Sequence, residues 1–69
     1  MQDTGRYEFR VAERLSATTL AAFPELATTD HGAGPVLYGS VRDDSELHAI
    51  LSRFQLLGLT VVDVHRLPD

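Results

Sequence analysis

An amphipathic stripe between Asp43 and Gly58 is the feature that most constrains this fold. Its apolar residues recur with the spacing of one helix face, and they are Leu47, Ile50, Leu51, Phe54 and Leu57. Asp43 or Asp44 is placed to cap the first turn, and Asp43 with Glu46 three residues later forms a capping box. Gly58 stands where a helix commonly ends in a left-handed residue. We therefore predict a helix over this segment, packed through its apolar face.

Strand patterns lie on both sides of this helix. From Tyr7 to Leu15 apolar and charged residues alternate, which predicts a strand with one buried face. Val36–Val41 is apolar on both faces in its first half, as in a central strand, and its Gly39 indicates a bulge or a close backbone approach. Leu59–Leu67 is rich in β-branched residues and is followed by a proline, so it predicts the last strand.

Two elements with less clear sequence patterns complete the chain. Ser16 has the character of a helix N-cap, so we expect a short helix over Ala17–Phe23 that ends before Pro24. Glu25–Asp30 is interpreted as a short polar edge strand, and the glycine-containing run His31–Pro35 as a turn.

The predicted order is strand, helix, strand, strand, helix, strand. With both crossovers right-handed, this order gives a four-stranded antiparallel sheet with strand order 4-1-3-2 and both helices on one face. The predicted fold class is α+β, the ferredoxin-like split βαβ arrangement, as a single domain over residues 7–67 after a frayed start at 1–6. The alternative is a swapped or partly open version, in which the weak second strand pairs with a partner chain.

Composition excludes several classes of function. The 69 residues leave room for one domain, and the absence of cysteine excludes disulfides and thiolate sites. Ten acidic residues against six arginines give a net charge of −4, which argues against nucleic-acid binding. No apolar run approaches a membrane span and no signal peptide is evident, so we expect a cytoplasmic protein without membrane contact.

Catalytic and metal sites are not indicated. The histidines, His31, His48 and His65, are spaced 17 residues apart on three different elements, so we interpret them as surface residues rather than metal ligands. Asp63 and His65 share one strand face, and a carboxylate that orients an imidazole supplies two of the three members of a catalytic triad, but no activated nucleophile accompanies them. We therefore predict a protein that is not an enzyme and that holds no cofactor.

The outward face of the sheet is the candidate interaction surface. Its predicted members are charged, and they are Glu8, Arg10, Arg14, Asp63 and His65. In the last strand Leu59 and Val61 alternate with Val62 and Val64, so one pair covers the core and the other lies on the open face, unless a bulge or twist brings both inward. We expect a protein-interaction module that associates through this face or through an edge strand, as a homodimer or with a heterologous protein.

Two resemblances accompany this interpretation. Length and element order are similar to small regulatory domains of the ACT type, which implies a small-molecule ligand near Arg14 and Ser16 as an alternative function. Their glycine before the helix is missing here, where the loop reads Arg14-Leu15-Ser16-Ala17. The second half of the chain, with Leu47-His48 and Leu57-Gly58-Leu59, resembles short uncharacterised proteins from GC-rich bacteria, a resemblance that points to no known activity.

Overall fold

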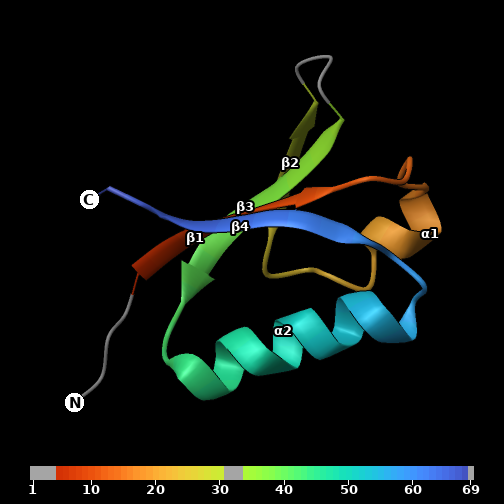
Figure 1. Ribbon diagram of the computed structural model, residues 1–69. Coiled ribbons are helices and arrows are strands. Elements are labelled where there is room, and N and C mark those ends of the chain that lie inside the picture. Colours follow the sequence, from red (N-terminus) through yellow and green to blue (C-terminus); the bar gives the residue numbers. More distant parts are fainter. Residues whose placement is uncertain (1–4, 31–33, 69) are drawn as a thin grey trace.

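The computed structural model describes residues 5–30 and 34–68. Along the chain its elements are β1 (Gly5–Val11), α1 (Ala17–Leu20), β2 (Ala27–Asp30), β3 (Pro35–Val41), α2 (Asp44–Leu56) and β4 (Val61–Leu67). The four strands form one antiparallel sheet in the order β2-β3-β1-β4, which is 4-1-3-2 when counted from the other edge. An α+β fold with a four-stranded antiparallel sheet and two helices is thereby confirmed. Helix α2 runs along one face of the sheet, and α1 lies at one end of it (Figure 1).

Strand β1 has the buried and outward faces that its alternation predicts. Phe9 and Val11 are fully buried, and Glu8 and Arg10 point to the other face. The strand begins at Gly5, two residues earlier than expected, because Gly5 and Arg6 continue the pairing with β3.

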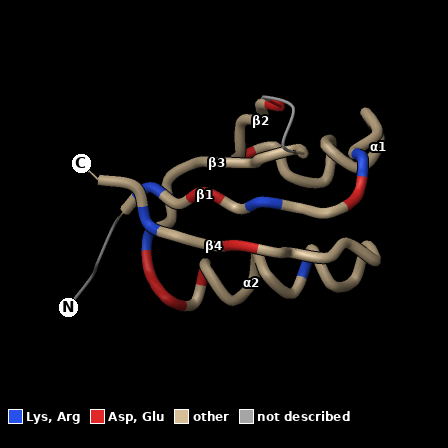
Figure 2. The backbone as a smooth tube through the Cα atoms, turned by 45° about the horizontal axis from the view of Figure 1, so that its top comes forward, with Lys and Arg blue, Asp and Glu red and all other residues tan. Residues whose placement is uncertain are grey.

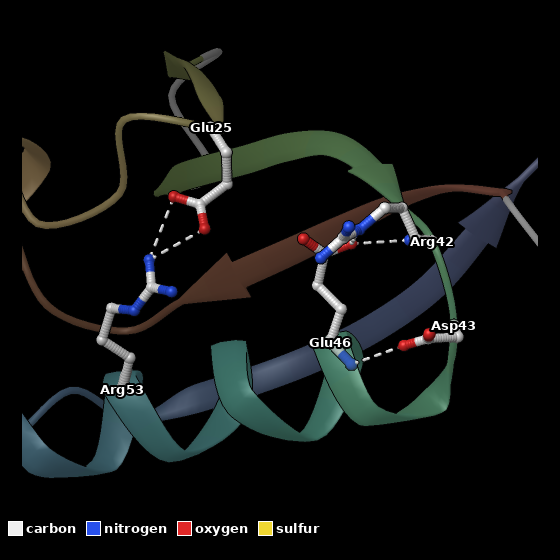
Figure 3. Close-up of polar contacts among 5 residues, drawn as sticks. All are labelled: Glu25, Arg42, Asp43, Glu46 and Arg53. Atoms are coloured by element: carbon white, nitrogen blue, oxygen red, sulfur yellow. Dashed lines mark hydrogen bonds and ion pairs between the residues drawn. The ribbon is translucent and has the colours of Figure 1, made fainter.

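Helix α2 begins and ends where its capping residues predict. Asp43 is the N-cap, and its Oδ1 accepts the backbone N–H of Glu46 at 2.9 Å. The Glu46 carboxylate accepts the backbone N–H of Arg42 at 2.6 Å (Figure 3). The second bond of the expected capping box is therefore made to Arg42, one residue before the N-cap. Gly58 has a positive φ of 75°, the left-handed conformation expected beyond the helix end.

Helix α1 is shorter than the predicted Ala17–Phe23. Ser16 is its N-cap as expected, with the Thr19 N–H donating to Ser16 Oγ at 3.1 Å. After Leu20 the chain tightens into a turn, in which the N–H groups of Ala22 and Phe23 donate to carbonyls three residues earlier. Pro24 then disfavours a helical Phe23. The following turn places Phe23 in the core, where its ring stacks on Phe54 with centroids 4.5 Å apart.

The hairpin of β2 and β3 differs slightly from its predicted bounds. Strand β2 begins at Ala27 rather than Glu25, because the N–H of Leu26 donates to the Phe23 carbonyl in a turn. This turn lies against Gly39, where a Cβ would be 2.9 Å from the Glu25 carbonyl oxygen. Gly39 is therefore a point of close backbone approach, one of its two predicted roles. Of the predicted turn, residues 31–33 lie outside the described part of the chain.

Strand β4 carries a register shift beside its first residues. Arg10 pairs with Asp63 but Val11 pairs with Val61, so Val62 is an extra residue in the ladder. Beyond this bulge Val64 lies opposite Phe9 and shares its face, so Asp63 and His65, and not Val64, lie on the open face. The alternative, in which a bulge brings both pairs of residues into the core, is realised only in part. Leu59 and Val61 pack on the core, but Val62 remains 56% and Val64 36% exposed at the edge of the sheet.

The core lies between the sheet and α2. Seven apolar side chains are fully buried there, and they are Phe9, Val11, Phe23, Leu37, Val41, Ile50 and Phe54. Neither described helix is long and apolar enough to cross a membrane.

Candidate functional site

The sheet register brings four of the five predicted face residues together. Glu8 pairs with His65 and Arg10 pairs with Asp63, all on the face opposite α2. The fifth, Arg14, does not join them, because β1 ends at Val11 and Arg14 lies in the following loop. Figure 2 shows basic and acidic residues alternating along β1, with an acidic position beside them on β4.

His65 is held between two carboxylates. Its Nδ1 lies 2.8 Å from Asp63 Oδ2, and its Nε2 lies 3.1 Å from Glu8 Oε1. A neutral imidazole has one N–H, so only the protonated ring donates to both carboxylates at once. In a catalytic triad the nitrogen opposite the carboxylate must contact the nucleophile. Here Glu8 occupies that nitrogen, so the arrangement suits a cross-strand ion-pair network rather than a general base.

A depression of about 360 Å³ opens on the same sheet face. It is lined by residues from β1, β2 and β3 and by the end of β4, among them Arg6, Glu8, Arg10, Thr29, Val36 and Tyr38. The Nε of Arg10 is buried without a hydrogen-bond partner among the described residues. Val36 lies directly opposite Arg10 and is only 7% exposed, so the part of the outward face beside Arg10 is apolar.

Sequence reasoning missed Arg6, Val36 and Tyr38 as members of this site. Arg6 could have been found, since it continues the alternation of Glu8 and Arg10 by one more step. It was assigned to the frayed start because the strand was predicted to begin at Tyr7. Val36 and Tyr38 depend on the pairing of β3 with β1, which no local pattern specifies.

The loop after β1 is structured by its own contacts. Ser16 uses its hydroxyl within the α1 cap, donating to Thr19 Oγ1 at 3.0 Å and accepting the Thr19 N–H. Glu13 accepts the backbone N–H of Thr60 at 2.7 Å, and this bond lowers the pKa of the Glu13 carboxyl. Arg14 lines a second depression of about 570 Å³ at this end of the sheet.

An ion pair remote from the sheet face was not predicted. Arg53 of α2 donates to both carboxylate oxygens of Glu25 at 3.0 Å (Figure 3). It also donates to the Ala22 carbonyl at 3.0 Å. Its guanidinium carbon lies 5.3 Å from the centroid of the Phe23 ring. The hydrogen bond from Arg53 lowers the pKa of Glu25. These contacts connect α2 to the turn before β2, which is a structural role.

The described residues contain no group of three histidine, cysteine or acidic side chains that is arranged to hold a metal ion. His48 lies exposed on α2 and His65 on β4, and the predicted surface residue His31 falls outside the described part of the chain.

Comparison with known proteins places the chain in a family. Neither the curated proteins nor the solved structures gave a match. A family model described as a domain of unknown function, DUF8691, matches residues 6–65, a range that begins within β1 and ends within β4. Because this match spans most of the sequence and every element of the sheet, the chain belongs to the DUF8691 family.

Proposed function

We propose that this protein is a small non-enzymatic interaction module of ferredoxin-like fold, which pairs with a second copy of itself through strand β4. The observation that supports this most is the exposure of that strand. In the described sheet β4 is hydrogen-bonded to β1 alone, and its residues 62–66 are all exposed. An edge strand of this length presents a row of N–H and C=O groups that can pair with another strand.

The other edge strand of the sheet, β2, is less suited to pairing with a second copy. Strand β2 has four residues against the seven of β4, so it provides a shorter ladder for a partner. The alternative function, an ACT-type ligand site near Arg14 and Ser16, also has weaker support, because the Ser16 hydroxyl is already used in the α1 cap.

The sequence of β4 is complementary to itself about Val64. In an antiparallel pair of two β4 strands centred there, Val64 faces Val64 of the partner, and Asp63 faces His65 of the partner. Asp63 and His65 share the open face in each copy, so the facing groups are a carboxylate and an imidazole. Both helical layers then lie on the same side of one eight-stranded sheet.

This register is favoured over its neighbours by charge. A shift of two residues in one direction places Asp63 opposite Asp63, and a shift in the other direction places His65 opposite His65. Like groups directly opposite one another are destabilising, so both shifted pairings are disfavoured. Strand pairing alone buries less surface than a standard interface of about 800 Å² per partner, so we expect a dimer that dilution reverses.

The test is the molar mass in solution, measured by light scattering after size exclusion over a hundredfold range of concentration. The proposal predicts a rise from 7.6 kDa toward twice that mass. Val64→Lys introduces a charge at the centre of the pairing and should leave a folded monomer. Leu56→Lys is the matched control, because Leu56 is 86% exposed on α2 and outside the pairing.

A monomer at every concentration contradicts the proposal. So does a loss of the dimer in Leu56→Lys equal to that in Val64→Lys. The melting temperature of each variant, measured at the lowest concentration, separates loss of association from loss of folding.

A further inference from the structure

The depression on the open sheet face has the size and composition of a small-molecule site. Its volume of about 360 Å³ falls within the range of ligand pockets, and it combines apolar surface with a few polar groups. The apolar part comes from Val36 and Tyr38 of β3, and the charged part from Arg6, Glu8 and Arg10 of β1.

The charge of this depression is opposite to that of the whole protein. Two arginines and one glutamate give its ionisable lining a formal charge of +1, in a chain whose net charge is −4. The carboxylates of this face are also already engaged. Glu8 and Asp63 both contact the His65 ring, at 3.1 and 2.8 Å.

The Nε of Arg10 has no hydrogen-bond acceptor within the described part of the chain. The cross-strand neighbour of Arg10, Asp63, is bound by His65, and the Nε is buried with no partner among residues 5–30 and 34–68. Buried N–H groups in native structures are nearly always hydrogen-bonded, so an unpaired one calls for an explanation. An arginine that lines a partly apolar depression, and whose Nε–H has no acceptor among the described residues, is suited to an external carboxylate.

We propose that the depression binds a small organic carboxylate with an apolar body. The guanidinium of Arg10, with that of Arg6, holds the carboxylate group, and Val36 and Tyr38 contact the body. This site follows neither from the family assignment nor from the proposed self-association of β4. Edge-to-edge pairing leaves the open face uncovered, so the proposal of a carboxylate site and the proposal of a dimer can be refuted independently of one another.

The experiment is a titration of ¹⁵N-labelled protein followed by amide chemical shifts, at low protein concentration and constant ionic strength. The probe is benzoate, and its neutral analogue benzamide is the control for apolar contact alone. The proposal predicts saturable shifts from benzoate in residues 6–10 and 35–39, with at least tenfold weaker binding of benzamide.

Three arginine variants show which positive charge contributes to benzoate binding. Arg10→Gln and Arg6→Gln should each weaken benzoate binding, Arg10→Gln by at least tenfold. Arg14→Gln removes the same charge outside the depression and should leave binding within twofold of the parent protein. The amide spectrum of each variant also shows whether it is folded, and the Arg6 variant keeps the test informative if Arg10→Gln does not fold.

Several results would overturn the proposal. They are the absence of saturable shifts from benzoate, equal binding of benzamide, or shifts centred on the loop at Arg14. An equal loss of binding in Arg14→Gln would show a diffuse charge effect rather than a site.

Discussion

Replacing Arg10 with methionine should stabilise the protein. The Nε of Arg10 is buried with no hydrogen-bond partner among the residues that the structure describes, and an unsatisfied buried donor costs about 1–3 kcal/mol. Methionine keeps an unbranched side chain against Val36, which lies directly opposite, and carries no donor. The change also removes a positive charge beside the cross-strand neighbour Asp63, and such a cross-strand pairing is worth about 0.2–1 kcal/mol. The balance is a gain of about 1 kcal/mol in the free energy of unfolding.

For a domain of this size, a gain of about 1 kcal/mol corresponds to a rise of about 4–8 °C in melting temperature. The assay is urea unfolding followed by circular dichroism, at a concentration where the protein is monomeric. The midpoint should rise with an unchanged m-value, because only stability and not the exposed area changes. Arg6→Met is the matched control, since Arg6 lines the same depression but has no buried unpaired atom in the described structure.

Two outcomes would refute this reasoning. One is a loss of stability of more than about 0.5 kcal/mol in Arg10→Met, which would mean that the guanidinium makes favourable contacts that outweigh the unpaired donor. The other is an equal gain in Arg6→Met, which would indicate a general effect of removing positive charge from the face.

Three further predictions concern the contacts that hold α2 and the hairpin. Asp43→Ala removes the cap bond to the Glu46 N–H and should cost about 1 kcal/mol in urea unfolding, whereas Asp43→Asn should retain most of that stability. Gly39→Ala places a Cβ about 2.9 Å from a backbone carbonyl and should cost roughly 1–3 kcal/mol, an expectation that an unchanged melting temperature would disprove. Because Arg53 lowers the pKa of Glu25 in the folded state, the pair stabilises the protein above the ordinary glutamate pKa and loses this effect as pH falls through the folded pKa. Glu25→Gln should therefore cost several tenths of a kcal/mol at pH 7 and progressively less toward pH 3, and a difference that does not depend on pH would contradict this.

The best-predicted parts of the fold are those that local chemistry determines. The bounds of α2 follow from Asp43 and Gly58, which act within one turn of the helix ends. The length of α1 was wrong because Phe23 lies in a turn and packs on Phe54, a contact between residues far apart in the chain. The face of Val64 depends on the bulge at Val62, and the alternation of residues within one strand does not reveal a bulge.

The candidate site was predictable to a similar extent. Alternation along two strands was enough to group Glu8, Arg10, Asp63 and His65, because neighbouring strands keep their faces in common. Arg14 was wrongly included because the end of β1 was not visible in its pattern. The depression itself was not predicted, since it depends on the pairing of β1 with β3 and on the burial of side chains from both strands.

Whether β4 is the surface of self-association can be measured by amide hydrogen exchange. Exchange is measured residue by residue at a dilute and at a hundredfold higher concentration. With pairing through β4, amides of β4 within 62–66 exchange more slowly at high concentration, while the exchange of amides in the other edge strand, β2, does not change. Unchanged exchange in β4, or new protection confined to β2 or to the open face of β1 and β3, would contradict it.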